Sequence, residues 1–458
     1  DGFDAAADQL DSRYIYSMSQ GGALQRLDKI SGDRKSIRPV HPKGDKLRFN
    51  WNAGFAQDPV DKSVIYYGSQ YLHKSSDKGD NWEIISPDLT TNDTSKQKQD
   101  ESGGLTIDAT GAENFTTIIS IAPSPVTEGI IWVGTDDGNL QLTKDGGKTW
   151  ENVIKNIKGV PEGSWIPQIR ASSYDSKEAV VVINNYRRDD WKPYVYRTAD
   201  FGKTWTPIVK ESDVAGYALT FIQDPVQKNL YFLGTELGLY ISIDAGKSWT
   251  KWTNGYPTVS TYDFAIQPRE NDLAIATFGR SLYIIDNIQP LRELAKEGPA
   301  LLAKKVKLFD TPDAYQYEFK SASGIGSPGS SEFRGENLSR GAMISFYVQA
   351  DTAKGGDKIR LQIFDRENKL VRTLSPKFEK GFNRIFWMFE RRGISMPGAR
   401  AGGGGRGGFR RNPGDEPAGP SVLPGEYKIK ITYMNVKDST TVRVFSDPRL
   451  DVKMENLV

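Results

Sequence analysis

The sequence contains no cysteine and only two histidines, His41 and His73, among 458 residues. Without cysteine the chain can form no disulfide, no thiolate nucleophile and no cysteine-based zinc site. Two histidines leave little material for a Ser-His-Asp triad or a multi-histidine metal centre. The Walker A, H-E-x-x-H and EF-hand motifs are missing as well. We therefore predict neither a metal site nor a cofactor.

The sequence also lacks an excess of charge and any long apolar segment. Lys and Arg number 60 against 58 Asp and Glu, a balance that indicates no nucleic-acid or anionic-lipid partner. No run of about 18 apolar residues occurs that could form a membrane span. The segment GGGGRGGFRR at 402–411 is similar to RNA-binding RGG sequences, but its surroundings are not basic. We interpret it as a loop tip.

The composition is rich in glycine, aromatic and β-branched residues, which favours strands joined by turns. An eight-residue pattern, Ser/Thr-x-Asp-x-Gly-x-x-Trp, occurs four times, each time after a short apolar strand. We call each copy a box. Strand patterns suggest about four short strands for each box, which is typical of a β-propeller. The boxes span residues 75–82, 143–150, 198–205 and 242–249.

The residue types of the box all have a structural use. Glycine can adopt a positive φ without a Cβ clash, and Asp and Ser/Thr can accept hydrogen bonds from backbone N–H groups of the same turn. Tryptophan can pack its ring on the blade. An active site occurs once and the box occurs four times, so we predict a structural role, not a catalytic or calcium-binding one. The residues concerned are Asp77, Gly79, Trp82, Asp145, Gly147, Trp150, Asp200, Gly202, Trp205, Asp244, Gly246 and Trp249.

The strand patterns predict an all-β chain with two β domains. Residues 1–289 are expected to form about six four-stranded propeller blades, which either close here or belong to a larger propeller assembly. A helical and then extended linker is expected over 290–337. Alternating apolar residues over 338–446, with Trp387 in the core, predict an Ig-like β-sandwich. Residues 447–458 are expected to be a C-terminal tail.

One connection inside the third boxed unit carries charges and aromatic rings on a loop, as a recognition site requires. We predict binding by its residues Tyr186, Arg187, Arg188, Asp189, Asp190 and Trp191. The alternative is a solvated, salt-bridged hairpin.

Two acidic residues near strand ends of the second boxed unit, Glu113 and Asp137, are further binding candidates. The sequence Asp136-Asp137-Gly138 also fits a tight hairpin turn. Trp51 and Trp165 fit either a sugar-stacking platform or the core. We predict no catalytic residue.

The four boxes look like the Asp-box, or BNR, repeats of sialidases, xyloglucan-cleaving glycosidases and the sortilin/VPS10 propeller. Over nearly the whole chain the sequence resembles the bacterial VPS10/sortilin-like BNR-repeat proteins, which are often labelled glycosyl hydrolases. The segments that carry the resemblance are RFNWNAGFAQDP (48–59), YLHKSSDKGDNWEIISPDLTTND (71–93), IISIAPSPVTEGIIWVGTDDGNLQLTKDGGKTWENV (118–153), YRRDDWKPYVYRTADFGKTW (186–205), FGRSLYIIDNIQPLREL (278–294), ENLSRGAMISFYV (336–348), GFNRIFW (381–387), LPGEYKIKI (423–431) and SDPRL (446–450).

The resemblance implies that the chain is the C-terminal portion of a longer protein, with more blades or a second propeller before Asp1. It implies a secreted, periplasmic or cell-surface protein associated with the bacterial outer membrane. It also implies a binding or scaffold role, with a peptide, protein or glycan as the ligand on the propeller. A place in an outer-membrane or secretion assembly is a further hypothesis.

The alternative function is a glycoside hydrolase of the sialidase or xyloglucanase type. Sialidases carry an F/Y-R-I-P segment, where this chain has Ser36-Ile37-Arg38-Pro39, and their arginine clamp and Tyr-Glu pair are not recognisable. The cysteine-rich module of sortilin is absent too. We therefore favour a non-catalytic protein. Two carboxylates about 5–10 Å apart on an open face, flanked by aromatic rings, would favour the hydrolase.

Overall fold

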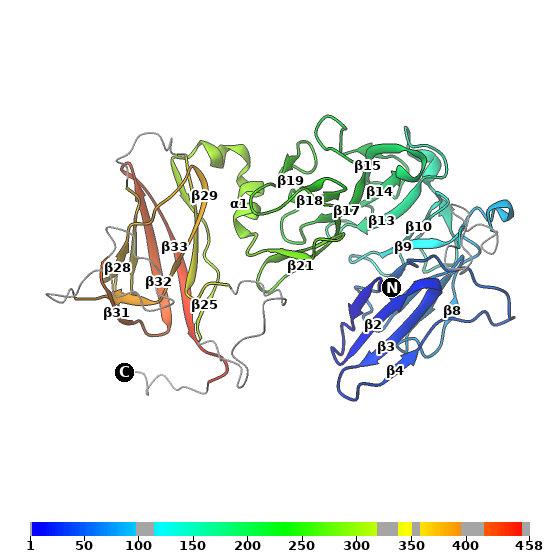
Figure 1. Ribbon diagram of the computed structural model, residues 1–458, viewed down its shortest axis with the longest axis horizontal. Helices are drawn as coiled ribbons and strands as arrows, with labels where there is room; N and C mark the ends of the chain where they lie inside the picture. The colour runs from blue at the N-terminus through cyan, green and yellow to red at the C-terminus, as the bar shows by residue number, and fades with distance from the viewer. Residues whose placement is uncertain (1, 98–113, 318–337, 350–357, 395–415, 451–458) are drawn as a thin grey trace. The chain divides into compact units, whose positions relative to one another are not determined.

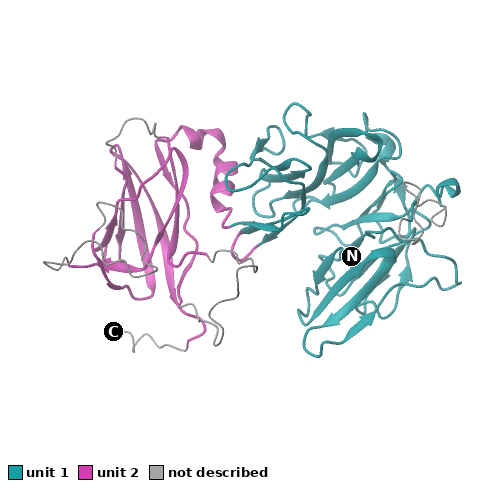
Figure 2. Ribbon diagram, in the orientation of Figure 1, with its two compact units in different colours: residues 1–267, 272–285 teal, residues 268–271, 286–458 magenta. Residues whose placement is uncertain are grey.

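A computed structural model of the chain describes residues 2–97, 114–317, 338–349, 358–394 and 416–450. The chain divides into two compact units (Figure 2). Unit 1 contains residues 1–267 and 272–285, and unit 2 contains residues 268–271 and 286–458. Nearly all regular structure in both units is β-strand (Figure 1). The structure thus confirms the all-β class. The glycine-rich segment 402–411 lies outside the described residues.

Unit 1 is built from six sheets of consecutive antiparallel strands, the blades of a β-propeller. Blade one contains β1 (Ala5–Ala7), β2 (Tyr14–Ser19), β3 (Ala23–Asp28) and β4 (Arg34–Ser36). Blade two contains β5 (Phe55–Gln57), β6 (Ile65–Gly68), β7 (Leu72–Ser75) and β8 (Glu83–Ile84). Blade three contains β9 (Ile118–Pro123), β10 (Ile131–Thr135), β11 (Leu140–Thr143) and β12 (Glu151–Asn152).

The next three blades continue the same strand order. Blade four contains β13 (Trp165–Ala171), β14 (Ala179–Asn185), β15 (Asp190–Thr198) and β16 (Thr206–Pro207). Blade five contains β17 (Ala218–Gln223), β18 (Tyr231–Thr235), β19 (Gly238–Ser242) and β20 (Thr250–Lys251). Blade six contains β21 (Thr261–Gln267), β22 (Asp272–Thr277) and β23 (Leu282–Ile285). The four short 3-10 helices described in this unit are η1 (Gln20–Gly22), η2 (Thr94–Lys96), η3 (Ile154–Asn156) and η4 (Tyr186–Arg188).

Blade six differs from the expected four-stranded blade. After β23 the chain has no box and no fourth strand; it enters helix α1 (Gln289–Glu297), which has a proline in its first turn. Because proline has no N–H and a fixed φ, it suits a helix start and not a sheet strand. Five of the six blades therefore have four strands, and the sixth has three.

The box is a closed set of hydrogen bonds between the third and fourth strands of a blade. In blade three, Asp145 Oδ1 accepts from the hydroxyl of Thr143 at 2.8 Å and from the backbone N–H of Thr149 at 2.9 Å. The N–H of Gly147, which has a φ of 98°, donates to the Thr143 hydroxyl at 3.0 Å. The Thr149 hydroxyl also donates to Asp145. The hydrogen bonds that Asp145 accepts, with that of the Thr149 hydroxyl as the largest effect, lower the pKa of Asp145 to about 2. The other three boxes repeat this pattern.

Each box also contacts the blade before it, which the sequence reading did not anticipate. In blades one to four, the residue directly after the fourth strand is apolar, and the box glycine of the next blade lies against it. These residues are Ile37, Ile85, Val153 and Ile208. Three of the box tryptophans donate their indole N–H to the carbonyl of that residue: Trp82 to Ile37 at 2.8 Å, Trp150 to Ile85 at 3.2 Å and Trp249 to Ile208 at 2.8 Å. The fourth, Trp205, bonds to Gly202 of its own box and meets the Trp132 ring of blade three edge-on. The boxes thus join blades as well as closing turns.

Unit 2 is a β-sandwich. One sheet has the order β24 (Val306–Leu308), β26 (Ala342–Val348), β29 (Gly381–Trp387). The other has the order β25 (Ala314–Gln316), β33 (Val436–Ser446), β32 (Gly425–Tyr433), β27 (Arg360–Phe364), β28 (Leu370–Leu374), and a small pair is formed by β30 (Glu390–Arg392) and β31 (Ala418–Ser421). Both large sheets contribute to a single apolar core that contains Trp387.

Helical structure in unit 2 is limited to α1 and the 3-10 helix η5 (Gly298–Ala303) among the residues that are described. The break between them is at Gly298, whose φ is 71°. Within the described ranges, no helix has the length and apolar character needed to cross a membrane.

Candidate functional site

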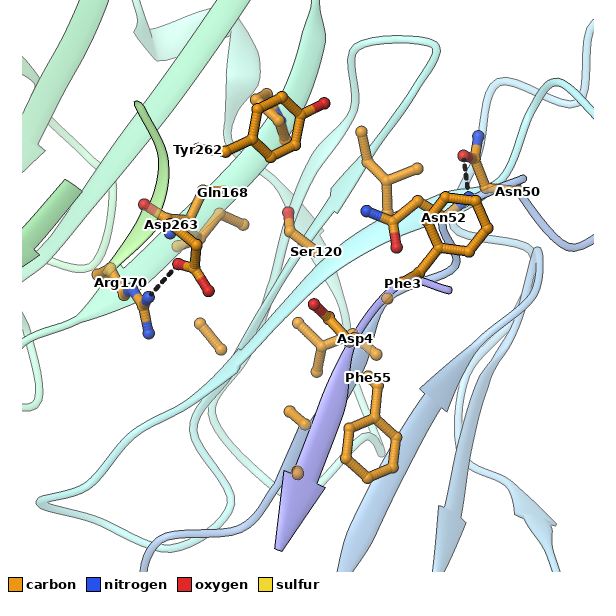
Figure 3. Close-up of a pocket in the computed structure, with 18 of the residues that line it drawn as sticks. Phe3, Asp4, Asn50, Asn52, Phe55, Ser120, Gln168, Arg170, Tyr262 and Asp263 are labelled. Carbon is orange, nitrogen blue, oxygen red and sulfur yellow. Dashed lines mark hydrogen bonds and ion pairs between the residues drawn. The ribbon is translucent and has the colours of Figure 1, made fainter. Parts of the chain in front are cut away.

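The described part of unit 1 contains a cavity of about 810 Å³ that is lined by the first strand of every blade. Each of these strands lies at the end of its sheet, so one backbone edge has no neighbouring strand. Apolar and aromatic side chains share the wall with a small number of charged ones, as in most ligand sites. Figure 3 shows part of this wall, with labelled side chains from blades one, two, three, four and six around the same space. We take this cavity as the candidate site.

A row of stacked aromatic and cationic groups forms one side of the cavity. The Arg187 guanidinium carbon lies 3.4 Å from the ring centroid of Trp165 and 4.4 Å from that of Tyr186. Tyr186 stacks in turn on Tyr217, with centroids 4.4 Å apart, and Trp191 lies 5.7 Å beyond. Trp165, Tyr186 and Arg187 line the cavity, whereas Trp191 is half-exposed at the far end of the row. The row places a guanidinium against two aromatic rings at the cavity wall.

Arg187 has no counter-charge in the described part of the chain, where it makes neither a hydrogen bond nor an ion pair. The side chain of Arg187 is exposed to solvent on the side that faces the cavity. On its other sides it is surrounded by protein. Burial lowers the pKa of Arg187, partly opposed by the phenols of Tyr186, Tyr262 and Tyr217. A guanidinium remains charged at any physiological pH. The cavity therefore contains a fixed cation available to a ligand.

The rest of the predicted binding loop braces this cation. Arg188 donates to the backbone carbonyls of Glu162 and Gly163, which ties the loop to the preceding connection. Asp189 adopts a left-handed φ of 58° and closes the turn. Asp190 accepts from the Tyr194 hydroxyl at 2.8 Å. Of the six loop residues, only Tyr186 and Arg187 reach the cavity.

The acidic candidates from the second boxed unit lie elsewhere. Asp137 is buried and accepts from the N–H and hydroxyl of Thr91, both at 2.7 Å, so it is occupied in joining two blades. Its neighbour Asp136 is fully buried and bonded to Thr117 and Asn50, and burial, followed by the nearby charge of Asp137, raises the pKa of Asp136 to about 8. Glu113 lies outside the described residues. Trp51 does line the cavity, and Trp165 lies there under the Arg187 guanidinium.

Three charged residues of the cavity were missed by sequence reasoning. Asp4 precedes β1 in blade one, Arg170 is on β13 in blade four and Asp263 is on β21 in blade six. Arg170 and Asp263 form an ion pair at 3.4 Å (Figure 3). Asp4 is exposed to the cavity, yet protein surrounds it on its other sides. That burial and the Asp263 charge raise the pKa of Asp4 to about 6, opposed by Arg170. No local pattern marks these residues, because the three are far apart in the chain.

Other chemically interesting groups lie away from the cavity. Ser69 and His73 form a 2.8 Å hydrogen bond, but both are buried in blade two, where burial lowers the pKa of His73 to about 4. Within the ranges that the structure describes, no group of three or more His, Asp or Glu side chains is placed to hold a metal ion. We therefore consider the cavity, and not these groups, as the candidate binding site of unit 1.

Comparisons with known proteins assign no family to the chain. No family model matches the sequence, and no curated protein matches it either. Among solved structures, the chain is similar to a GH74 enzyme of Niastella koreensis at 17% identity and a TM-score of 0.41, covering 63% of this chain and 45% of that one. It is similar to the extracellular domain of a hybrid two-component system from B. thetaiotaomicron at 12% identity and a TM-score of 0.42, covering 97% and 50%. It is also similar to YCF48 from Cyanidioschyzon merolae at 13% identity and a TM-score of 0.41, covering 62% and 82%. The chain spans half or less of the length of the first two proteins.

Proposed function

We propose that unit 1 is a binding module whose central cavity holds a peptide or protein segment by an anionic group at Arg187. The observation that carries this proposal is the Arg187 guanidinium, which lies over the rings of Trp165 and Tyr186 without a carboxylate partner in the described chain. A cation that is held in place by ring faces and lacks a counter-ion has already lost most of its side-chain freedom. Binding an anion then costs little additional ordering.

The geometry of Arg187 favours a planar oxyanion. Its guanidinium carbon lies 3.4 Å from the Trp165 centroid and 4.4 Å from the Tyr186 centroid, and its N–H groups make no hydrogen bond within the described chain. A carboxylate accepts two such N–H groups in parallel, which adds directional preference to the charge attraction. Stacking on Trp165 and Tyr186 restrains the side chain from turning away.

A peptide suits this wall better than a neutral sugar. Sugar rings stack on free aromatic faces, but Arg187 occupies the faces of Trp165 and Tyr186 that it covers. The first strands of the blades offer unpaired backbone edges to the cavity. An extended peptide can hydrogen-bond to such an edge, as in strand-addition complexes. Unit 2 would serve as a spacer or docking module, and the protein would work outside the cytoplasm, as the family resemblance implies.

The binding proposal is tested on an array of acidic peptides with matched amide counterparts, in which Gln and Asn replace Glu and Asp. We expect the full chain to bind acidic peptides and the Arg187→Met variant to lose at least about tenfold in affinity. Arg187→Lys keeps the charge without the planar fork and should be intermediate. Arg34→Met removes an exposed cation on β4 and serves as the control. Equal binding by the wild type and Arg187→Met would overturn the proposal.

Glycoside hydrolysis remains the second candidate because the cavity contains two carboxylates with different environments. Asp263 is paired with Arg170, whereas the pKa of Asp4 is raised, and aromatic rings of Phe3 and Tyr262 adjoin them in the chain. Such a difference is what separates an acid from a base in glycosidases. Release of reducing sugar from xyloglucan or a sialoside, abolished by Asp4→Asn and by Asp263→Asn, would establish it. Absence of release, or release that survives both substitutions, would eliminate it.

A further inference from the structure

We propose that the protonation state of Asp4 sets which ligand charges the cavity accepts. When Asp4 is ionised, the cavity takes a ligand with one anionic group, at Arg187, and prefers a cationic or neutral group near Asp4. When Asp4 is neutral, the cavity also admits a second anionic group, beside Arg170. This inference rests on the proposed function, because it assumes that Arg187 holds the first anionic group.

The position of Asp4 is set by the backbone of blade one. The N–H of Phe3 donates to the carbonyl of Met18 at 3.1 Å, and the N–H of Met18 donates to the carbonyl of Asp4 at 3.2 Å. These two bonds attach the segment before β1 to the edge of β2. The Asp4 side chain consequently lies on a fixed element of the cavity wall (Figure 3).

The charges around Asp4 do not balance. Asp263 from blade six and Arg170 from blade four line the same cavity (Figure 3), where the Asp263 charge raises the pKa of Asp4 and the Arg170 charge lowers it. Arg170 is already committed to the Asp263 carboxylate at 3.4 Å and to the carbonyl of Phe221 at 3.3 Å. The Asp4 carboxylate accepts no hydrogen bond from any described residue. The carboxylates of Asp4 and Asp263 and the guanidinium of Arg170 together leave one negative charge.

Protonation of Asp4 removes that surplus charge and leaves the neutral pair of Arg170 and Asp263. Because burial and the Asp263 charge both oppose ionisation, the pKa of Asp4 is raised to about 6, so the change falls between about pH 5 and pH 7. In the same cavity Arg187 keeps its charge throughout this range. Asp4 and Arg187 therefore respond differently to pH.

Three synthetic peptides test the inference. Each carries one Glu for Arg187 and, at a second position, either Lys, Gln or cysteic acid, whose sulfonate stays ionised. For the wild type we expect the affinity ratio of the Lys peptide to the cysteic acid peptide to be high at pH 7.5 and roughly tenfold lower at pH 5. The Gln peptide should change least. Asp4→Asn should show the low ratio at both pH values.

Asp33→Asn provides the matched control, since it removes one exposed carboxylate from a turn of blade one outside the cavity. It should behave like the wild type. A pH-dependent ratio that persists in Asp4→Asn would overturn the inference, and a wild-type ratio that does not change with pH would also overturn it. If Arg187→Met abolishes binding while Asp4→Asn has no effect on the ratio, the proposed function stands and this inference alone falls. If no peptide binds the wild type, both fall.

Discussion

Gly147 of blade three lies directly against the backbone carbonyl of Ile85 at the end of blade two. A Cβ atom on Gly147 would come within 2.4 Å of the Ile85 oxygen, and the Trp150 indole of the same box donates to that oxygen at 3.2 Å. The glycine of a box is therefore required twice, once for its positive φ and once for the space that the preceding blade occupies. The contact explains how a turn formed by local hydrogen bonds also sets the position of its neighbour.

Substitution of Gly147 should separate these two requirements. Its neighbour Gly146 also has a positive φ, of 73°, but nothing lies within 4 Å of the position that a Cβ would take. Gly146→Ala should cost about 1 kcal/mol for the left-handed backbone alone. Gly147→Ala should cost about 2–3 kcal/mol more, because a backbone atom cannot move aside as a side-chain end can. Urea unfolding of the two variants measures the difference, and equal losses would show that the contact between blades is unimportant.

Asp136 should make the stability of unit 1 depend on pH in an unusual direction. Its pKa is raised by burial from 3.8 to about 8, so the folded chain holds this proton more tightly than the unfolded chain. The resulting stabilisation is complete below about pH 4 and is lost as the pH rises toward 8, by up to about 1.4 kcal/mol per pH unit. Asp136→Asn cannot ionise and should lack this loss.

The measurement is the free energy of unfolding of the wild type minus that of Asp136→Asn, taken from pH 5 to pH 8. We expect this difference to fall steadily as the pH rises. Asp33→Asn, which removes an exposed carboxylate, should show a nearly constant difference. Parallel curves for the wild type and Asp136→Asn would mean that Asp136 is ionised in the folded protein throughout.

Trp165 should contribute to anion binding through Arg187 without touching the anion itself. Trp165→Leu removes one of the two ring faces that hold the guanidinium, and cation–π contacts of this kind contribute about 0.5–2 kcal/mol. Affinity for acidic peptides should fall about three- to thirtyfold, with a smaller change for neutral peptides. Trp191→Leu, at the half-exposed end of the row, should have little effect. An equal loss in the two variants would contradict a direct role for the Trp165 ring.

Arg372 should be a determinant of stability in unit 2. It is buried, donates to the carbonyls of Arg391, Pro417 and Glu416, and forms an ion pair with Glu390 at 3.2 Å. Arg372→Met removes these hydrogen bonds and the ion pair with Glu390 from a buried position and should cost about 3 kcal/mol.

Hydrogen exchange of peptides from β28 and β32 reports the stability of unit 2 separately from unit 1. The control is Arg443→Met, which breaks an exposed ion pair with Asp313 and should cost less than about 1 kcal/mol. Exchange that increases equally in both variants would show that the buried arginine has no special role.

The propeller could be predicted because its repeat is a local structure. The hydrogen bonds of the Thr143 and Asp145 side chains in the box at 143–150 all join residues of that box, so eight consecutive residues contain the side-chain pattern of the turn. Repetition of this turn after short strands leads to the blade architecture, and alternation of apolar residues in the last third of the chain leads to the second sheet structure. The four-strand repeat did not predict that blade six lacks its fourth strand. Helix α1 begins where that strand would lie.

The candidate site could be predicted only in part. The loop containing Tyr186 and Arg187 was recognisable because charge and aromatic residues gather there once in the chain. Asp137 was a reasonable candidate by its position at a strand end, but its hydrogen bonds to Thr91 place it between two blades and away from the cavity.

The sequence by itself determined the blades, the box turns and the presence of one charged aromatic loop, because each depends on residues that are close in the chain. Only the tertiary structure decided which charges share a cavity. Asp4, Arg170 and Asp263 come from blades one, four and six and meet only because the first strands of all six blades line the same cavity. The same arrangement places Gly147 against Ile85. Contacts of this kind depend on how the blades are placed in space, and no local pattern of residues encodes them.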